Sequence, residues 1–482
     1  TRCLSDWSSD VCSSDLNNVD NFIWGMPLII LILFTGILLT VRLRGLQIRH
    51  LGKALHYVFH NEDDGEGEVT SFGALCTSLS ATIGTGNIVG CATAIVAGGP
   101  GALFWMWLAA FFGMATKYAE GMLAVKYRVI AEDGHTLGGP FYYIEKGMGK
   151  NFKWLAKLFC VFGTMVGLFG IGTFTQVNGI TSAVNNFFDP SNVHTISLFG
   201  MNYSISVVVA GIIVTICAGL VIIGGIKRIS KVSEVIVPFM AVTYIGVCLI
   251  IVFTHLPQVP AAFAEIVQSA FGLKAVAGGA IGAMTVAMQK GIARGIFSNE
   301  AGLGSAPIAA AAAQTNEPVR QGLVSMTGTF IDTIIVCTMT GLAIVMTGAW
   351  DMGLEGVAVT TKAFALGLPF PAKASAFVLM MCLVFFAFTT ILGWAYYSER
   401  CLEYLVNGKK FVITAFKWFY ILAVFIGPFM TVSAVWTIAD ICNGLMAFPN
   451  LVALLALNGD VVSETRGYLE RVGIVKTTVG EA

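Results

Sequence analysis

The sequence Ile83-Gly-Thr-Gly-Asn87 interrupts a long apolar run, and a similar sequence, Ala301-Gly-Leu-Gly-Ser305, interrupts another run 218 residues later. Two glycines one residue apart allow the backbone of a membrane-spanning helix to unwind. Unwound backbone at membrane depth is tolerated only where protein or a water-filled cavity satisfies its polar groups. Paired breaks in corresponding halves of a chain are typical of a binding site at the membrane midplane. The simpler alternative is that these glycines only allow close helix packing.

The composition is that of a polytopic membrane protein. Of the 482 residues, 56% are apolar and 12% are charged, and the mean hydropathy is +0.79, whereas a soluble domain carries about 25% charged residues. The formal net charge of zero gives no indication of a nucleic-acid partner. No CxxC or Cys/His spacing indicates a metal centre, and no HExxH or GxSxG motif indicates an enzyme, so we expect no catalytic residues and no cofactor.

Residues 1–16 differ from the rest of the chain. They are polar and contain no apolar stretch of the kind found in a signal peptide. We interpret them as a non-native remnant and leave them out of the predicted fold.

Hydropathy predicts an all-α fold with eleven membrane spans, since one span needs about 20 mostly apolar residues. The predicted spans are 21–41, 70–98, 102–127, 154–178, 204–226, 233–254, 285–314, 321–349, 374–398, 411–428 and 431–457. The segments 52–69 and 257–272 are predicted to be amphipathic and to lie on the surface. No separate soluble domain is expected, because the tail 458–482 is too short to bury a core.

The distribution of Lys and Arg predicts the orientation, because these residues are enriched in cytoplasmic loops. With the N-terminus outside, twenty Lys and Arg residues fall inside, and the outer loops keep only Lys274, Lys362 and Lys373. The C-terminus is then cytoplasmic. After the first helix (within 17–69), each break begins a group of five helices, 70–256 and 257–457. An odd number of helices inverts the second group relative to the first, which predicts an inverted repeat.

Several long motifs then resemble one family. They are Gly98-Gly-Pro-Gly-Ala-Leu-Phe-Trp-Met-Trp-Leu-Ala-Ala-Phe-Phe-Gly113, Lys117-Tyr-Ala-Glu120, Gly139-Pro-Phe-Tyr-Tyr143 and Gly291-Ile-Ala-Arg-Gly-Ile-Phe-Ser-Asn-Glu-Ala-Gly-Leu-Gly-Ser-Ala-Pro307. They resemble the alanine or glycine:cation symporters (sodium:alanine symporters) of the amino acid-polyamine-organocation superfamily. The resemblance implies a leucine-transporter-like core of five plus five helices with one extra helix first. It also implies a bacterial or archaeal plasma-membrane symporter of alanine or glycine with sodium or a proton.

An amino-acid substrate presents a carboxylate, and the free N–H groups at the start of a half-helix bind anions without any arginine. We therefore predict backbone contacts to the carboxylate at both breaks, from Thr85, Gly86, Asn87, Gly302, Leu303 and Gly304. Three further side chains are predicted to line the pocket and limit its size, namely Phe174, Gln176 and Trp394. The alternative for the aromatic residues is lipid contact or packing.

Carbonyl groups freed at a break can also coordinate a cation. The resemblance places Thr389 and Thr390 on the helix that binds sodium in this fold, opposite the carbonyls of Ser80, Ala81 and Gly84. The alternative is that each threonine hydroxyl bonds a carbonyl of its own helix.

Buried charges near the second break are the remaining candidates. Asp332 lies at mid-depth, where a carboxylate is costly and indicates function; it either joins a cation or proton path or pairs with Lys290 or Arg294. Asn299 and Glu300 either cap the half-helix that follows or reach the site. Together these features predict alternating access with coupled cation and substrate, and an uncoupled facilitator or channel is the competing interpretation.

Overall fold

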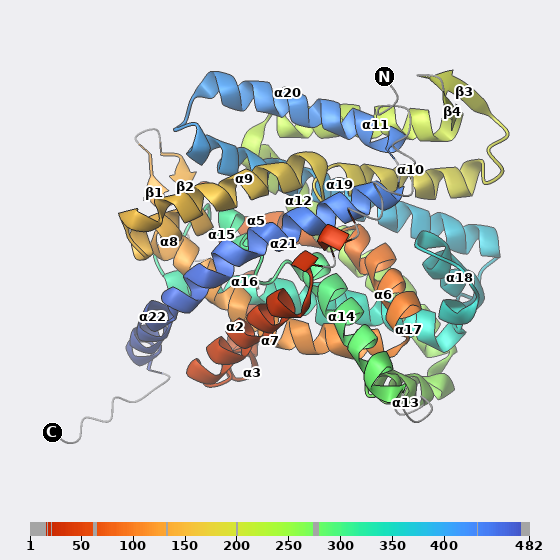
Figure 1. Cartoon of the computed structure of the whole chain (residues 1–482), viewed down its shortest axis with the longest axis horizontal. Helices are drawn as coiled ribbons and strands as arrows, with labels where there is room; N and C mark the ends of the chain where they lie inside the picture. The colour runs from red at the N-terminus through yellow and green to blue at the C-terminus, as the bar shows by residue number, and fades with distance from the viewer. Residues whose placement is uncertain are drawn as a thin grey trace.

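The computed structural model is a bundle of helices with two small antiparallel hairpins (Figure 1). The structure describes residues 16–473 except 17, 21, 61–64, 132–133, 199–200, 273–278 and 431. Almost all of the predicted remnant 1–16 and the last nine residues of the chain therefore lie outside the described residues.

Helices occupy each of the eleven predicted spans in the described chain. They are, in order, α2 (Met26–Arg42), α5 (Ser71–Thr82) with η1 (Gly86–Gly90) and α6 (Cys91–Gly98), α7 (Gly101–Lys126), α9 (Lys153–Phe169) with α10 (Phe174–Phe188), α11 (Ile205–Ile222), α12 (Gly225–Thr254), α14 (Ala280–Asn299) with α15 (Ala306–Ala310), α16 (Pro318–Thr329) with η4 (Phe330–Cys337) and α17 (Thr338–Thr347), α19 (Ala372–Leu405), α20 (Lys410–Ile426) and α21 (Val432–Ala456).

Length and apolar composition identify fewer spans than the sequence prediction. Six helical stretches of the described chain are long and apolar enough to cross a membrane, or up to eight if each of two bent helix pairs is one span. Helix α2 falls short because it has only 17 residues. The chain is thus a helical protein of multi-pass membrane type.

Short elements collect at the two ends of the long axis (Figure 1). The hairpin of β1 (Val129–Ile130) and β2 (Thr136–Leu137) lies at one end with α8 (Pro140–Gly147) and α22 (Asn458–Arg471). The hairpin of β3 (Thr195–Leu198) and β4 (Met201–Ser204) lies towards the other. The remaining short elements are α3 (Leu46–Arg49), α4 (Leu51–Phe59), η2 (Lys150–Phe152), η3 (Leu256–Gln258), α13 (Val259–Ala270), η5 (Ala349–Asp351), α18 (Val357–Gly367) and η6 (Gly427–Phe429). Segments predicted to lie on one side of the membrane therefore lie at one end of the molecule.

The first predicted break is present. Helix α5 ends at Thr82, and after a bend of 51° the chain continues as the π-helix η1 and then α6. Single-turn π-helical segments inside α-helices are frequent at functional sites.

The second predicted break is present as well, but its backbone is different. Between α14 and α15, residues Glu300, Gly302 and Gly304 have positive φ angles of 56°, 91° and 80°. Glycine adopts this region readily, whereas a side chain such as that of Glu300 disfavours it. The chain therefore loses helical structure over residues 300–305.

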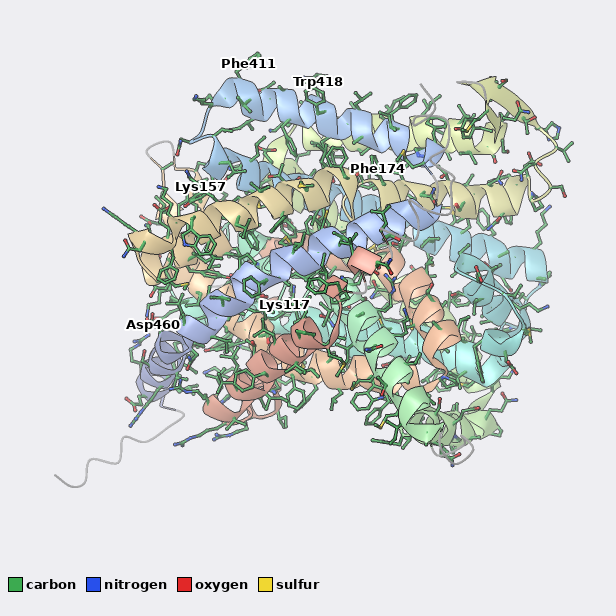
Figure 2. The ribbon with its side chains drawn as sticks, viewed as in Figure 1. Lys117, Lys157, Phe174, Phe411, Trp418 and Asp460 are labelled. Atoms are coloured by element: carbon green, nitrogen blue, oxygen red, sulfur yellow. The ribbon has the colours of Figure 1, made fainter. Side chains whose placement is uncertain are left out.

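The outer surface of several helices is apolar. On α20 the side chains of Phe411 and Trp418 point away from the bundle and are 85% and 61% exposed (Figure 2). Lys117, in contrast, lies inside the bundle and is only 1% exposed. Apolar side chains on the outside and a charged side chain inside are the reverse of the arrangement in soluble proteins, and they are expected of a protein surrounded by lipid.

Candidate functional site

The first break is enclosed by α10, α14 and α19. A β-carbon at Gly84 would lie 2.5 Å from Thr390 Oγ1 on α19, and one at Gly86 would lie 3.2 Å from Ser298 Cα on α14. Thr85 Cγ2 would be 2.6 Å from a β-carbon at Gly179 on α10. Because Ser298 stands at the C-terminal end of α14, the end of the helix before the second break packs against the first.

Unwinding frees polar groups of the first break. The N–H of Gly84 donates to Asn87 Oδ1 (2.9 Å), and the N–H of Thr85 donates to Gln176 Oε1 (3.1 Å). These two N–H groups would otherwise bond the carbonyls of Ser80 and Ala81, four residues earlier. The hydroxyl of Thr85 is enclosed and has no hydrogen-bond partner among the described residues.

The second break is filled by a carboxylate from α7. Glu120 Oε1 accepts hydrogen bonds from the N–H groups of Gly302 (3.1 Å) and Gly304 (3.2 Å) and from Asn450 Nδ2 (2.6 Å). The sequence predicted that these N–H groups, with Leu303, would contact the substrate. In this conformation Glu120 binds the N–H groups of Gly302 and Gly304, and the N–H of Leu303 donates to the Glu300 carbonyl (3.2 Å). The substrate contact at the second break stays a prediction.

Asn299 and Glu300 accept hydrogen bonds at the second break. Asn299 Oδ1 accepts from the N–H of Ala301 (2.9 Å). Glu300 Oε2 accepts from the Ser305 hydroxyl, and its Oε1 accepts from Trp394 Nε1 at 2.8 Å. Neither side chain accepts from an N–H of α15, whose N-cap is Ser305, so both roles that the sequence left open for them stay predictions.

The aromatic candidates differ in position. Trp394 is completely buried and links α19 to the second break through Glu300, so lipid contact is wrong for this residue. Phe174 instead packs against Ala423 of α20, with its ring 3.6 Å from a β-carbon placed at Gly427 (Figure 2). The structure thus brings Trp394 and Gln176 to the breaks and directs Phe174 towards α20.

Asp332 lies in the π-helix η4 and connects the two breaks. Its carboxylate accepts from Asn87 Nδ2 (2.7 Å), the Ser298 hydroxyl (2.9 Å) and the Thr333 hydroxyl (2.7 Å). Arg294, one of the partners proposed for it from the sequence, instead binds Asp440 through two hydrogen bonds of 2.8 and 3.1 Å. That proposed pairing is therefore wrong, and Asp332 is held by neutral donors.

Lys117 is a central residue that the sequence analysis did not select. It is enclosed on α7, electrostatically coupled to Glu120, Glu300 and Asp332, and its Nζ has no hydrogen-bond partner in the part of the chain that the structure describes. The signal was a Lys and a Glu three residues apart in the otherwise uncharged stretch 101–125. Buried charges of this kind inside a membrane indicate function.

The two threonines of α19 lie beside the end of α5. A β-carbon at Gly393 would be 2.8 Å from the backbone N of Ala81, so these helices are in close contact. Thr390 Oγ1 lies 3.4 Å from the carbonyl oxygen of Ile83 and 3.1 Å from that of Phe386. Thr389 donates only within its own helix and to the sulfur of Met240. Both hydroxyls therefore bond carbonyls of their own helix, as the alternative predicts, but only Thr390 also faces the break.

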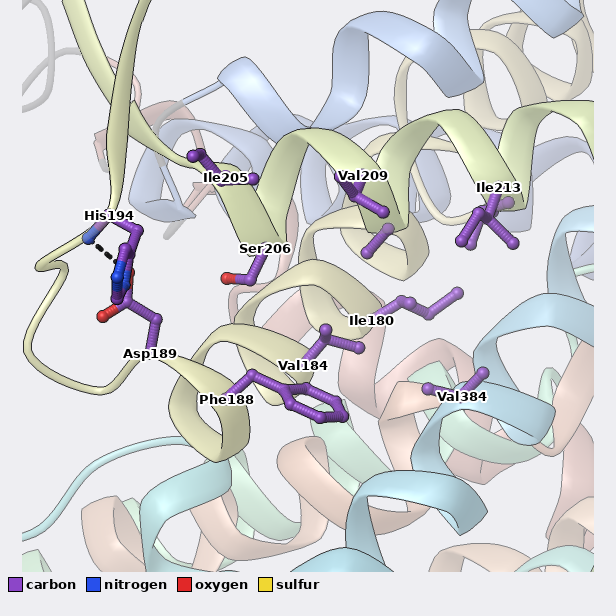
Figure 3. Close-up of a pocket in the computed structure, with 12 residues that line it drawn as sticks. Ile180, Val184, Phe188, Asp189, His194, Ile205, Ser206, Val209, Ile213 and Val384 are labelled. Atoms are coloured by element: carbon purple, nitrogen blue, oxygen red, sulfur yellow. Dashed lines mark hydrogen bonds between the residues drawn. The ribbon is translucent and has the colours of Figure 1, made fainter.

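A pocket of about 480 Å³ lies elsewhere, between α10, α11 and α19 (Figure 3). Most of its lining is apolar, including Ile180, Ile213 and Val384. None of the predicted site residues lines it. Among the described residues, no three His, Cys, Asp or Glu side chains are grouped to hold a metal ion.

Two interrupted helices that meet inside a helical bundle are typical of secondary transporters. The structure resembles that of MhsT in complex with L-phenylalanine, with a TM-score of 0.58 at 12% identity, over 83% of this chain and 93% of that one. It also resembles a sodium-coupled sialic acid symporter (TM-score 0.51, 12% identity, 94% and 92% covered). These similarities show the fold.

The chain belongs to the sodium:alanine symporter family, whose profile matches residues 9–479. It is 45% identical to the sodium/alanine symporter AgcS of Methanococcus maripaludis, over 94% of this chain and 97% of the relative. An uncharacterized transporter of Haemophilus influenzae is 55% identical (96% and 97% covered), and a probable sodium/glutamine symporter of Bacillus subtilis is 38% identical (93% and 89% covered). The family is one of transporters, as the sequence predicted.

Proposed function

We propose that this protein imports alanine or glycine together with sodium by alternating access, with both bound at the first break. The proposal is supported most by one observation. The break offers an unpartnered buried hydroxyl (Thr85), freed carbonyls (Ser80, Ala81) and a facing hydroxyl (Thr390) within one enclosed place. Membership of a sodium:alanine symporter family agrees with it.

The substrate carboxylate binds at the start of η1, where Thr85, Gly86 and Asn87 begin a half-helix with partial positive charge. The substrate ammonium binds at the opposite pole, the C-terminal carbonyls of α14 next to Ser298, where the helix dipole is negative. Gln176 releases the Thr85 N–H to the carboxylate and then bonds the substrate itself.

The lack of space at the first break favours a substrate with a small side chain. A β-carbon at Gly84 would lie within 3.1 Å of Thr390 and Gln176, and one at Gly86 would lie 3.2 Å from Ser298. Trp394 adds a buried ring that cannot move without breaking its bond to Glu300. These contacts support alanine and glycine over larger amino acids.

Sodium binds between α5 and α19. Its ligands are the carbonyls of Ser80, Ala81 and Gly84 and the hydroxyl of Thr390, with Thr389 joining only after its side chain rotates. Asp332 couples the cation to the substrate, because it holds Asn87 of the first break and Ser298 of α14 in one network.

The conformation seen here is closed at the end that carries β1 and β2. Residues Val69 and Ala313 form a parallel bridge there, and the guanidinium of Arg128 donates to the carbonyls of Ala311, Ala313 and Thr315. The Lys and Arg distribution assigns this end to the cytoplasm. Release of substrate to the cell then requires these contacts to separate.

The larger arrangement follows from the same proposal. Eleven spans cross the plasma membrane of a bacterium or archaeon, with the N-terminus outside, the C-terminus inside and 70–256 and 257–457 as inverted repeats. Lipid surrounds the exposed apolar faces of α11, α12 and α20. In the apolar stretch of each of these helices only 33% of the residues are buried within the protein.

Uptake of labelled alanine into proteoliposomes tests this function. An inward sodium gradient is expected to drive accumulation above the external concentration, and replacement of sodium by choline is expected to abolish it. Glycine should compete and glutamine should not. Equilibration at the same rate without sodium would instead identify an uncoupled facilitator.

A further inference from the structure

A charged cavity of about 300 Å³ opens between the segment that precedes α2, residues 289–294 of α14 and the side chain of Asp440 on α21. Its lining carries two acidic and two basic side chains, Asp20, Asp440, Lys290 and Arg294, together with Gln289. A cavity of this size accommodates an alanine molecule with some water. The function proposed above does not use it.

Only two of the four charged side chains, Arg294 and Asp440, bind each other. Arg294 and Asp440 bind through two hydrogen bonds, and Trp24 Nε1 fixes the same part of α21 by donating to the Asp440 carbonyl at 2.7 Å. Lys290 forms no ion pair with any residue that the structure describes. Asp20 Oδ1 is enclosed and has no hydrogen-bond partner there.

Asp20 is ionised at neutral pH despite its surroundings. Burial and the neighbouring Asp440 raise the pKa of Asp20 to about 6, and Arg294 and Lys290 oppose that increase. The cavity therefore presents an unsatisfied carboxylate oxygen and an unpaired ammonium group. Such a pair is complementary to a zwitterion, whose ammonium and carboxylate are separated by one carbon atom.

The cavity is next to the first break, and residues of α14 connect the two. The Arg294 guanidinium carbon is 5.5 Å from the centre of the Phe297 ring, and that ring would lie 3.4 Å from a β-carbon at Gly86. One helical turn of about 5.4 Å therefore separates the cavity from the proposed substrate site, and Phe297 stands between the two.

We propose that this cavity is an outer binding site for the zwitterionic amino acid, occupied before the substrate passes Phe297. Lys290 and Arg294 hold the carboxylate, and Asp20 holds the ammonium group. Binding draws Arg294 away from Asp440 and from the ring of Phe297, which opens the way to the first break. The inference rests on the proposed function, because it assumes that the substrate is an amino acid.

Occupancy is tested with a cysteine placed in the cavity. In Gln289→Cys, millimolar alanine is expected to slow labelling by a membrane-impermeant methanethiosulfonate reagent severalfold. The measurement is made in choline buffer, where the sodium-dependent inner site is empty. The additional change Lys290→Gln should remove this protection, and the unsubstituted protein measures the reaction of the native cysteines. Equal labelling with and without alanine would overturn the proposal.

Transport provides the second measurement. Lys290→Gln and Asp20→Asn should each raise the half-saturating alanine concentration severalfold, by a larger factor than any loss of maximal rate. Lys373→Gln, which removes a positive charge from the same predicted side of the protein, should transport as the original does. If Lys290→Gln and Lys373→Gln behave alike while sodium still drives uptake, the outer site is wrong and the proposed function stands. If the unsubstituted protein shows no sodium-driven uptake, the proposed function itself fails.

Discussion

The two breaks share the same glycine spacing but have different surroundings. At the second, Glu120, Asn299 and Glu300 already satisfy the backbone and the neighbouring hydroxyl. At the first, Thr85 keeps an unpartnered hydroxyl, and the carbonyls of Ser80 and Ala81 have lost their helical donors. The glycine spacing therefore specifies only that the helix unwinds. Which break binds a ligand depends on the side chains that the rest of the fold brings to it.

The largest expected effect concerns the second break. Glu120→Ala leaves the buried N–H groups of Gly302 and Gly304 without their acceptor and removes one of the two acceptors of Asn450 Nδ2. Removing one partner of a buried charged interaction costs about 3–5 kcal/mol, so we expect a marked fall in the unfolding temperature in detergent. Glu120→Gln, which keeps an acceptor oxygen, should lose much less. Normal stability of the alanine variant would show that the second break needs no carboxylate.

The next effect separates two adjacent threonines. Thr390→Ala is expected to raise the sodium concentration for half-maximal alanine uptake about tenfold, because its hydroxyl faces the Ile83 carbonyl. A tenfold change corresponds to about 1.4 kcal/mol. Thr389→Ala serves as the control and should have a smaller effect, since the Thr389 hydroxyl bonds its own helix. Equal sensitivity of the two variants would contradict this sodium site.

A substitution at the first break should weaken alanine binding without lowering the stability of the protein. The Thr85 hydroxyl makes no hydrogen bond to any described residue, so Thr85→Ala should leave the unfolding temperature nearly unchanged. One lost hydrogen bond of about 1 kcal/mol to the substrate predicts roughly fivefold weaker binding of alanine. Equilibrium binding of labelled alanine in sodium buffer measures it. Lower stability with unchanged binding would assign this hydroxyl a structural role.

The smallest effect concerns the contact between Glu68, which precedes α5, and the β1–β2 hairpin. Burial opposes ionisation of Glu68, but hydrogen bonds from His135 and the Thr136 N–H outweigh it and hold the pKa of Glu68 below 4.5. A lowered pKa stabilises the folded form above pH 4.5, and this contribution is lost as the pH falls through the lower, folded value. The acid-induced loss of stability should therefore be slightly smaller in Glu68→Gln. Identical pH dependence of the unfolding temperature in both proteins would exclude a role for this carboxylate.

Local sequence was sufficient to locate both breaks and the main helical segments, because glycine spacing and apolar run length act locally. It also selected Thr85, Gln176 and Trp394, which the fold brings to the breaks. The role of Glu120 depends on how α7 packs against the second break, and no local pattern contains that information.

The direction of Phe174 and the partner of Asp332 also depend on how the helices pack, which local sequence does not show. The predicted span 154–178 is interrupted between Phe169 and Phe174, so helical periodicity could not indicate which way Phe174 points. For Asp332 the sequence offered either a cation or proton path or a pairing with Lys290 or Arg294, the latter from their charges alone. The fold instead gives Arg294 a closer carboxylate, Asp440, on α21.

A structure of the protein determined with alanine and sodium tests the difference between the breaks most directly. Our account predicts the alanine carboxylate at the N–H groups of Thr85–Asn87, with Glu120 still bound to Gly302 and Gly304. An alanine carboxylate that replaces Glu120 at those two glycines would contradict it.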